Sequence, residues 1–394
     1  MSGNERFDVC AVVVSHLPHD ARVWKEARTL AATGRRVRLI GLRYGIDSVQ
    51  RRQEGGVEVV EQPFGERGEG SVAQRILIML RLWLEVLRTR ARVYHCHNIH
   101  PAPAVLIAAG LWRSPIIYDA HELYGEVPER AGWAPRLGAL GSRIAERLIS
   151  RRASAVITTN PSRAEVLAER HGLDNVEVVG NVPISADGVE PLDPGFPDGD
   201  VLLYQGGIYA QARAFESTIG ALKLLPGVSF AILGFGRPRD LSLIRNWAER
   251  EGVSERVHLF EPVPFRDLVR VAAAATVGIV PLRNISLNSY LGDTNKLFEY
   301  LMAGLPAVGS DFPEVARVLQ AGDPPVGETF DPEDEASIAR AISTVLRGSR
   351  TARRDSARRL ALERFCWERE EQVLVSCYDA ISQPASASDG SSRG

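Results

Sequence analysis

Short runs of aliphatic and β-branched residues alternate with amphipathic stretches along almost the whole chain. The strand candidates of the first half span residues 9–15, 36–42, 57–62, 92–96, 115–120, 155–160 and 176–181. Between the first two lies RVWKEARTLAATG (22–34), in which Val23, Ala27, Leu30 and Ala31 share one helical face before Gly34. Because parallel strands need crossover connections, this alternation predicts parallel sheets with helices on both faces.

The alternation is interrupted at residues 183–200, PISADGVEPLDPGFPDGD, which hold four prolines, three glycines and four aspartates. It resumes with strand candidates at 201–207, 230–236, 257–262, 277–282 and 306–311. We therefore predict two doubly wound α/β domains, 1–184 and 200–364, which face each other across a cleft and are joined by a linker at 185–199. A C-terminal helical stretch, about 333–349 and then 365–382, could pack on either domain. The polar tail 383–394 is predicted to be disordered.

Composition excludes several classes of function. The chain has 394 residues, 45% of them hydrophobic and 24% charged, and a net charge of −2 gives no reason to expect a nucleic-acid partner. Its four cysteines form no CxxC pair, which fits a reducing compartment. The start, MSGNERFDV, is too polar for a signal peptide, and no apolar run is long enough to span a bilayer. We expect a soluble cytoplasmic protein.

The ends of the predicted strands in the first half are unusually polar. Ligands of open parallel sheets bind at the carboxyl ends of the strands, and six of the eight histidines lie in the stretches SHLPHDAR, HCHNIH and DAHE. A zinc site needs three or four ligands, and no carboxylate or cysteine spacing completes one here. We interpret these stretches as the lining of a cleft and expect no metal. The candidate residues are His16, His19, Asp20, His97, Asn98 and His121.

One short stretch of the second half, DTNKLFEYLMAGLPAVGSD (293–311), predicts an anion site. Asp293 or Thr294 would cap a helix of about nine residues, which Gly304 would end. The helix N-terminus, with Lys296 beside it, suits a diphosphate, and Glu299, one turn deeper, could accept hydrogen bonds from ribose hydroxyls. The alternative is a solvent-facing Lys/Glu pair.

Two further turns of the second half could approach a phosphate. In YQGGIYAQAR, Arg213 lies one turn past a Gly-Gly loop, where it could grip a diphosphate or be an ordinary helix arginine. In LGFGR, Gly234 and Gly236 follow a strand, but the third glycine of the dinucleotide fingerprint is missing. We therefore expect no nicotinamide cofactor.

Together these stretches resemble the GT-B glycosyltransferases of the family-4 type, retaining enzymes that use nucleotide-sugar donors. The resemblance covers nearly the whole chain and rests on SHLPHDARVWKEARTLAATG, VYHCHNIH, IIYDAHELYGE, YQGGIYAQARAFE, LGFG and NKLFEYLMAGLPAVGSD. It implies two Rossmann-like domains. The stretch FCWEREEQVLVSCY resembles the closing helix that crosses back to the N-terminal domain.

The resemblance assigns roles to residues, with departures. Glu299 matches the second glutamate of the family motif, which holds ribose, but Leu291 stands at the first position. Arg213 falls where the family has its phosphate-binding lysine, and His121 matches the histidine that lines the reaction centre. His121, Arg213 and Lys296 are thus the implied catalytic residues. The other donor-side candidates are Gly207, Gly234, Gly236, Val263, Asn288, Asp293, Thr294 and Asn295, with Asn288 and Asp293 as replacements for the missing sugar contact.

The implied reaction moves a sugar, of hexosyl type, from a nucleotide diphosphate sugar to an acceptor hydroxyl with retained configuration. It would serve polysaccharide, glycolipid or natural-product synthesis, with a sugar, lipid-linked or small-molecule acceptor and no cofactor beyond the nucleotide sugar. Two alternatives are a non-catalytic nucleotide-sugar-binding or scaffold subunit, because Leu291 removes a familiar sugar contact, and a sugar-nucleotide epimerase on the same fold. Turnover of a labelled donor would distinguish an enzyme from the non-catalytic subunit. Formation of a product in the absence of acceptor would identify the epimerase.

Two basic stretches predict contact with a membrane or a lipid-linked acceptor. RILIMLRLWLEVLRTRAR (75–92) carries five arginines against one glutamate, with leucines and a tryptophan at helical spacing. GSRIAERLISRR (141–152) has the same character. We expect peripheral contact through the N-terminal domain at the inner face of the plasma membrane. The alternative is that each stretch buries one face in the core and turns its arginines to water.

Overall fold

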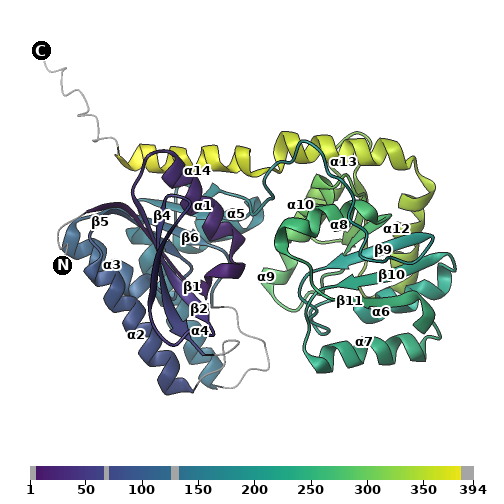
Figure 1. The fold of residues 1–394 in the computed structure, drawn as a ribbon, viewed down its shortest axis with the longest axis horizontal. Coiled ribbons are helices and arrows are strands. Elements are labelled where there is room, and N and C mark those ends of the chain that lie inside the picture. The colour runs from purple at the N-terminus through teal and green to yellow at the C-terminus, as the bar shows by residue number, and fades with distance from the viewer. Residues whose placement is uncertain (1–5, 66–70, 126–132, 383–394) are drawn as a thin grey trace, which may run out of the picture. The chain divides into compact units, whose positions relative to one another are not determined.

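The structure, a computed structural model, describes residues 6–65, 71–125 and 133–382. These residues divide into two compact units (Figure 1). The first holds the chain up to Thr159, then 163–179, and the residues from Glu370 onward; the second holds Asn160–Ser162 and Gly180–Arg369. Residues 180–184, predicted in the first domain, cluster with the second unit, and the predicted tail lies outside the described residues.

The first unit is built on one sheet with the strand order β3-β4-β2-β1-β5-β6-β7-β8. Every neighbouring pair is parallel except β3 with β4. The central strands are buried on both faces, as expected for runs of valine and isoleucine. The strands are β1 (Phe7–His16), β2 (Val37–Tyr44), β3 (Gln50–Glu54), β4 (Val57–Phe64), β5 (Ala91–His97), β6 (Ile116–Ala120), β7 (Ala155–Thr158) and β8 (Glu177–Val178).

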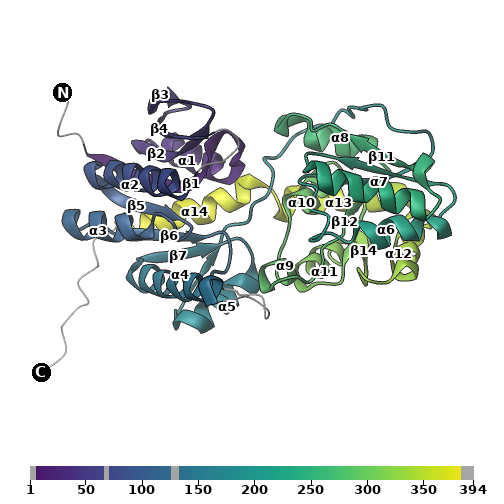
Figure 2. The same cartoon turned by 90° about the horizontal axis from the view of Figure 1, so that it is seen from below.

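Helices cover both faces of this sheet (Figures 1 and 2). α2 (Val72–Arg88), α3 (Ala102–Trp112) and α4 (Trp133–Arg152) lie on one face, with α2 beside α3 and α3 beside α4. α1 (Ala21–Ala32) and α14 (Trp367–Ser382) lie together on the other, where Thr29 donates to Glu371 and Arg35 pairs with Asp379. The part of α14 from Glu370 onward thus belongs to the first unit. α5 spans Pro161–His171.

The second unit holds a parallel sheet with the order β11-β10-β9-β12-β13-β14. Alternate residues of its central strand β9 enter separate hydrophobic clusters, Val201 and Leu203 on one face and Leu202 and Tyr204 on the other. The strands are β9 (Asp200–Gln205), β10 (Val228–Leu233), β11 (Val257–Phe260), β12 (Val277–Val280), β13 (Ala307–Ser310) and β14 (Gly327–Phe330). The helices are α6 (Phe215–Ala221), α7 (Pro238–Arg250), α8 (Leu268–Ala274), α9 (Leu287–Tyr290), α10 (Asn295–Met302), α11 (Pro313–Leu319), α12 (Glu335–Arg347) and α13 (Arg350–Arg364).

Every predicted strand is present, and two strands, β3 and β14, and two helices, α9 and α13, are additional. β3 and β14 are short strands with polar residues, and α13 fills the predicted gap between 349 and 365. Residues 183–199 contain neither helix nor strand. Among the described residues, no helix combines the length and the apolar character that crossing a bilayer requires.

Candidate active site

In the second unit, two glycines bring the ends of β9 and β10 into backbone contact. Gly206 and Gly234 have φ angles of +123° and +150°, which favour glycine. A Cβ added at Gly234 would lie 2.0 Å from the Gly206 carbonyl oxygen, and the Gly206 amide donates to Leu233 at 2.9 Å. A Cβ at Gly236 would lie 2.9 Å from the Ile208 side chain. The carboxyl edge of this sheet therefore presents bare backbone, which a ligand can approach closely.

The N-terminus of α10 lies at the same edge. Thr294 is the N-cap by backbone position, but its side chain makes no capping bond and its buried Oγ1 has no partner among the described residues. The first amides of a helix have no intrahelical acceptor and carry partial positive charge. Gly304, with φ +66°, follows the helix as predicted. This end of α10 is therefore short of hydrogen-bond acceptors.

Lys296 and Arg213 place two cations beside that end. Lys296 is buried, with Nζ 5.1 Å from the centre of the Tyr204 ring, and Arg213 Nε donates to the Tyr204 hydroxyl at 3.3 Å. In the described part of the chain, no carboxylate lies within ion-pair distance of either cation. Burial, followed by the Arg213 charge, lowers the pKa of Lys296 to about 7, while Glu299 opposes this shift. A lysine and an arginine side by side, with no carboxylate in ion-pair contact among the described residues, favour the binding of a dianion.

Glu299 lies one turn deeper and is also buried. It accepts a hydrogen bond of 2.5 Å from Gln205 Nε2, at the end of β9. The Gln205 Oε1 atom is buried without a partner among the described residues. A carboxylate and a free amide oxygen together offer acceptors of the kind that ribose hydroxyls need.

The other predicted donor-side residues are more dispersed. Asn160 Nδ2 donates to Asp293 Oδ1 at 2.7 Å and to the Leu291 carbonyl at 3.0 Å, so Asp293 already has a protein partner. Asn288 lies on α9 and Asn295 is the exposed first residue of α10. Val263 packs against the hydrophobic cluster of the second unit, and Gly207 faces the Tyr209 ring.

In the first unit, a buried charge network occupies the carboxyl ends of β5 and β6. Asp119 accepts two hydrogen bonds from Arg22, at 2.9 and 2.8 Å, and its Oδ2 lies 3.0 Å from His97 Nδ1 and 2.9 Å from His121 Nε2. Burial by itself would raise the pKa of Asp119, but Arg22 and then His121 hold it well below its usual range. Asn98, with φ +63°, accepts from the His121 amide at 3.2 Å. The network fixes His121 while leaving its ring partly exposed.

Beneath this network lie two groups whose pKa shifts favour their neutral forms. Arg22 Nε is 3.0 Å from Glu26, but its single hydrogen is donated to Asp119. Burial raises the pKa of Glu26 well above its usual value, and Arg22 offsets only part of this. Burial also lowers the pKa of His95 well below its usual value, and Nδ1 of His95 lies 2.8 Å from the Tyr378 hydroxyl.

Four of these buried groups could in principle hold a metal ion. One ligand atom each from Glu26, His95, His97 and Asp119 lies within 4.8 Å of the others. However, Arg22 already donates to both oxygens of Asp119. An arginine inside the ligand set repels a cation, so the donor set fits a metal poorly. The expectation of no metal stays a prediction.

A second acceptor-side group lies at the end of β1. The His16 ring stacks on Tyr44, with centroids 4.2 Å apart, and His19 meets its edge at 4.7 Å. Burial, followed by His19, lowers the pKa of His16. Asp20 caps α1 through the Val23 amide and accepts from Ser15 Oγ at 2.5 Å. His16, His19 and Asp20 thus form a second group, and Asp20 lies within electrostatic range of His97.

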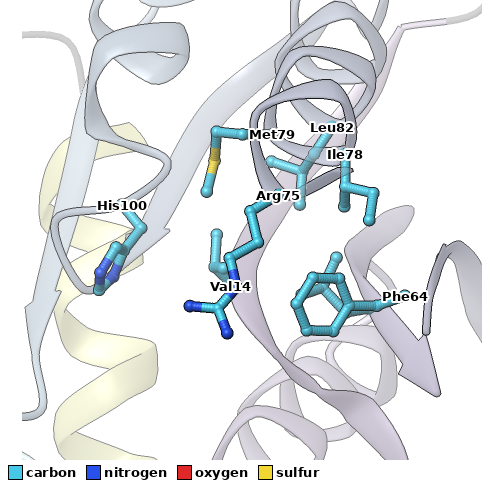
Figure 3. Close-up of a pocket in the computed structure, with 8 residues that line it drawn as sticks. Val14, Phe64, Arg75, Ile78, Met79, Leu82 and His100 are labelled. Atoms are coloured by element: carbon cyan, nitrogen blue, oxygen red, sulfur yellow. The ribbon is translucent and has the colours of Figure 1, made fainter. Parts of the chain in front are cut away.

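A cavity of about 400 Å³ lies between α2 and the ends of β1, β2 and β4. Figure 3 shows Arg75 between His100 and Phe64, with Val14 on the sheet side. The remaining walls are apolar: Leu42, Ile78, Met79 and Leu82. Phe64 also contacts Tyr44, 5.6 Å between centroids, so the cavity adjoins the His16 group. It can accept a partly apolar ligand that carries an anionic or polar group.

Several residues of these sites were not singled out from the sequence. Arg22 and Glu26 lie four residues apart on the buried face of α1, a spacing that looks like an exposed helical ion pair. Gln205 is the last residue of β9 and directly precedes the glycine turn. A polar residue at the carboxyl end of a parallel strand is a candidate for ligand binding, so its position could have identified it. Nothing in the sequence indicated that Tyr378 reaches His95.

Comparison with known proteins agrees with this arrangement. Residues 20–181 match the model of the "Glycosyl transferase 4-like domain", and residues 199–348 match that of "Glycosyl transferases group 1". The two matches together cover more than half of the chain. The chain belongs to the glycosyltransferases. Its two parallel-sheet α/β units are those of the GT-B fold, so the predicted fold class and enzyme class are confirmed.

Two curated relatives lie within the same class. A D-inositol 3-phosphate glycosyltransferase of Xylanimonas cellulosilytica is 25% identical over 316 residues, 73% of this chain and 71% of the relative. A phosphatidyl-myo-inositol mannosyltransferase of Mycobacterium leprae is 25% identical over 225 residues, 55% of this chain and 57% of the relative.

Solved structures share the fold at lower identity. Sucrose-phosphate synthase from Thermosynechococcus elongatus aligns with a TM-score of 0.75 at 14% identity, over 95% of this glycosyltransferase and 99% of that chain. The Anabaena protein HepE, in complex with UDP and glucose, aligns with a TM-score of 0.68 at 16% identity, over 95% and 100% of the two chains.

Proposed function

We propose that this glycosyltransferase moves a sugar from a nucleotide diphosphate sugar, bound by the second unit, to an acceptor hydroxyl with retention of configuration. The observation that supports this most directly is the pair of cations Lys296 and Arg213, which have no carboxylate partner among the described residues. They adjoin the α10 N-terminus and the glycine contact, and a diphosphate satisfies all of these features at once. HepE, solved with UDP and with UDP-glucose, supports the donor class.

The chemical roles follow from where charge develops. As the glycosidic bond breaks, negative charge grows on the leaving diphosphate, where Lys296 and Arg213 would stabilise it. Glu299 and Gln205 would hold the ribose, and Asn288 and Asp293 would lie toward the sugar. An acceptor hydroxyl would attack from the face that the diphosphate leaves, assisted by the leaving phosphate.

The first unit would bind the acceptor. His121, held by Asp119, would line the reaction centre, with His97 and Asn98 supporting it and His16, His19 and Asp20 contacting the acceptor. The cavity beside Arg75 favours an acceptor with an apolar part and an anionic group, as in a lipid-linked sugar. A cytoplasmic location, with four free buried cysteines, and independence of metal belong to the same proposal.

The experiment begins with a thermal-shift screen of UDP-, GDP- and dTDP-sugars, followed by turnover of the labelled donor that binds. Lys296→Ala and Arg213→Ala should each lower turnover roughly a hundredfold, with a smaller loss of donor affinity. Glu299→Gln should weaken donor binding about tenfold or more, because a charged acceptor of the ribose becomes neutral. Nucleoside monophosphate binding should be nearly insensitive to Lys296→Ala.

Matched controls are Lys223→Ala and Arg347→Ala, which remove exposed cations of the same unit. If all three site variants bind donor and turn over at the parent rate, α10 is only scaffold and the proposal is wrong. Donor binding without transfer or hydrolysis would favour the scaffold alternative. An altered donor sugar formed without acceptor would identify an epimerase.

A further inference from the structure

Exposed large apolar side chains gather on the outer face of α2, α3 and α4. Of the nineteen such side chains among the described residues, ten lie on these helices. They are Ile76, Leu77, Leu80 and Leu84 on α2, Ile107, Leu111 and Trp112 on α3, and Leu140, Ile144 and Leu148 on α4. We call these ten residues the outer apolar face.

The outer apolar face is a regular feature of each helix. Leu140, Ile144 and Leu148 follow one another at four-residue spacing, and each is more than half exposed. On α2, Leu82 and Val86 are fully buried on the side opposite the outward leucines. Both sides of that helix are thus apolar, although only one packs on the sheet.

α3 is the most unusual of the three. Its sequence, APAVLIAAGLW, contains no charged or hydrogen-bonding side chain except the tryptophan, yet Ile107 and Leu111 are 54% and 66% exposed. A helix that is apolar all round is ordinarily buried in a core or in lipid. α2, α3 and α4 lie side by side over one face of the sheet, so their exposed residues share one surface (Figures 1 and 2).

The charge on these helices has one sign. Their exposed charged side chains, among those that the structure describes, are the arginines Arg75, Arg81, Arg88, Arg143, Arg147, Arg151 and Arg152. The two acids, Glu85 and Glu146, are buried, Glu85 against Arg51 and Glu146 against His171. In a chain of net charge −2, this segregation is a local excess of positive charge.

We infer that the outer apolar face docks on the surface of a bilayer that contains anionic lipids. Apolar side chains would enter the headgroup boundary, and the arginines beside them would meet lipid phosphates. Trp112, with the Arg90 guanidinium 5.2 Å from its ring, is of the type enriched at membrane interfaces. A second copy of the chain is a poorer occupant, because a two-fold contact would set arginines against arginines.

The inference does not depend on the proposed donor chemistry, and its test is separate. The full-length protein is floated on a density gradient with vesicles of phosphatidylcholine alone or of equimolar phosphatidylcholine and phosphatidylglycerol, at low and at high salt. We expect flotation with the anionic vesicles at low salt. Donor binding, followed by thermal shift, should be the same in every variant.

Two triple variants separate the apolar and the electrostatic contributions. Leu80→Ser/Leu84→Ser/Leu148→Ser should lower the partition coefficient roughly a hundredfold, because each leucine would lose its burial in lipid. Arg81→Gln/Arg88→Gln/Arg147→Gln should lower it about fivefold per arginine on anionic vesicles only. The matched controls are Val49→Ser/Leu224→Ser/Leu362→Ser and Arg239→Gln/Arg245→Gln/Arg347→Gln, all at exposed positions elsewhere. They should float like the parent.

Three outcomes would overturn the inference. One is a parent protein that stays with the protein-only fraction on anionic vesicles. Another is that the leucine and the arginine triple variants both float as well as the parent. The third is a parent dimer, seen by sedimentation, that the leucine variant converts to monomer, because the face would then be an interface between copies of this chain.

Discussion

Both units gather charged side chains at the carboxyl ends of their central strands, but they balance the charge differently. In the first unit, the Asp119 carboxylate is fully buried and is neutralised by Arg22, with His97 and His121 around it. In the second unit, Lys296 and Arg213 lie close together, and no carboxylate among the described residues pairs with them. Glu299, the nearest acid along the helix, is engaged by Gln205.

The pKa shifts express this difference. Arg22 and the histidines hold the pKa of Asp119 well below its usual range despite burial, so folding favours its charged form. Burial and Arg213 lower the pKa of Lys296 to about 7, so folding opposes its charged form. The ionised Asp119 therefore contributes to the stability of the fold, whereas the charged Lys296 lowers that stability until an anion binds. A charge that the protein leaves uncompensated indicates where a ligand belongs.

Among the tests of this contrast, Asp119→Asn has the largest expected effect. The change removes the carboxylate that accepts two hydrogen bonds from the buried Arg22 guanidinium, and breaking a buried pair from one side costs about 3 to 5 kcal/mol. We expect a loss of that size in the free energy of unfolding, measured by urea denaturation. Because Asp119 ionises at low pH when folded, its contribution is present at neutral pH and is lost as pH falls through its lowered pKa.

The control is a double-mutant cycle with Arg22→Met. The double variant should be less destabilised than the sum of the two single changes, because no unpaired charge remains buried. Additive losses, or a loss below about 1 kcal/mol for Asp119→Asn, would mean that the pair does not support the fold in the way described.

The two sites also differ in how far the sequence predicted them. The α10 site was visible because Lys296 and Glu299 break an otherwise apolar pattern at the start of a short helix. The buried Arg22 and Glu26 were not, because their four-residue spacing is typical of exposed ion pairs, and their burial depends on segments distant in sequence, such as β6, whose Asp119 binds Arg22. Sequence indicates residue type and spacing, whereas burial of a charge depends on distant segments.

The missed elements of the fold have a similar cause. β3 has the sequence QRRQE and pairs only as an antiparallel edge strand, so it needs no apolar face. α13 is arginine-rich and buries a narrow stripe, including Ser356 and Ala357, that gives little periodic signal. The contact of Gly206 with Gly234 joins two loops far apart in the sequence, and the sequence shows only that glycines follow both strands.

Lys296→Met should have the opposite sign to Asp119→Asn. Methionine keeps the apolar stem and removes the buried charge, so we expect the ligand-free protein to gain on the order of 2 to 4 kcal/mol of stability near pH 6. Between the folded pKa of about 7 and the model-peptide value of 10.5, the unfolded state binds more protons. The gain should therefore be complete below pH 7 and fade as pH rises through that window.

Lys223→Met is the matched control, because Lys223 is 44% exposed and lies 2.6 Å from a Glu251 oxygen. It should be neutral or slightly destabilising. Thermal unfolding of both variants at several pH values measures the difference. A Lys296→Met protein that is less stable than the parent at pH 6 would show that the lysine is satisfied within the fold, and the contrast between the two units would fail.

The smallest expected effect concerns the pH dependence of nucleoside diphosphate binding. A bound diphosphate should raise the pKa of Lys296 above its free value of about 7, because two phosphates favour the ammonium form. Phosphate itself is already ionised above its second pKa of about 6, so changes above pH 7 report on the lysine. Affinity should be highest between about pH 6 and pH 7 and decline by less than about tenfold per pH unit above that range, with proton uptake on binding.

Calorimetry in two buffers of different ionisation enthalpy measures both the affinity and the proton uptake. Lys296→Met should bind weakly at every pH and take up no proton through this group, matching the high-pH limit of the parent. Arg213→Gln should still take up a proton on binding, because Lys296 is present. Near pH 7 the number of protons taken up should be smaller than in the parent, since removing Arg213 raises the pKa of Lys296 in the free protein. Equal parent affinity at pH 7 and pH 8.5, or uptake that survives in Lys296→Met, would place the diphosphate away from this lysine and leave its buried charge without a function.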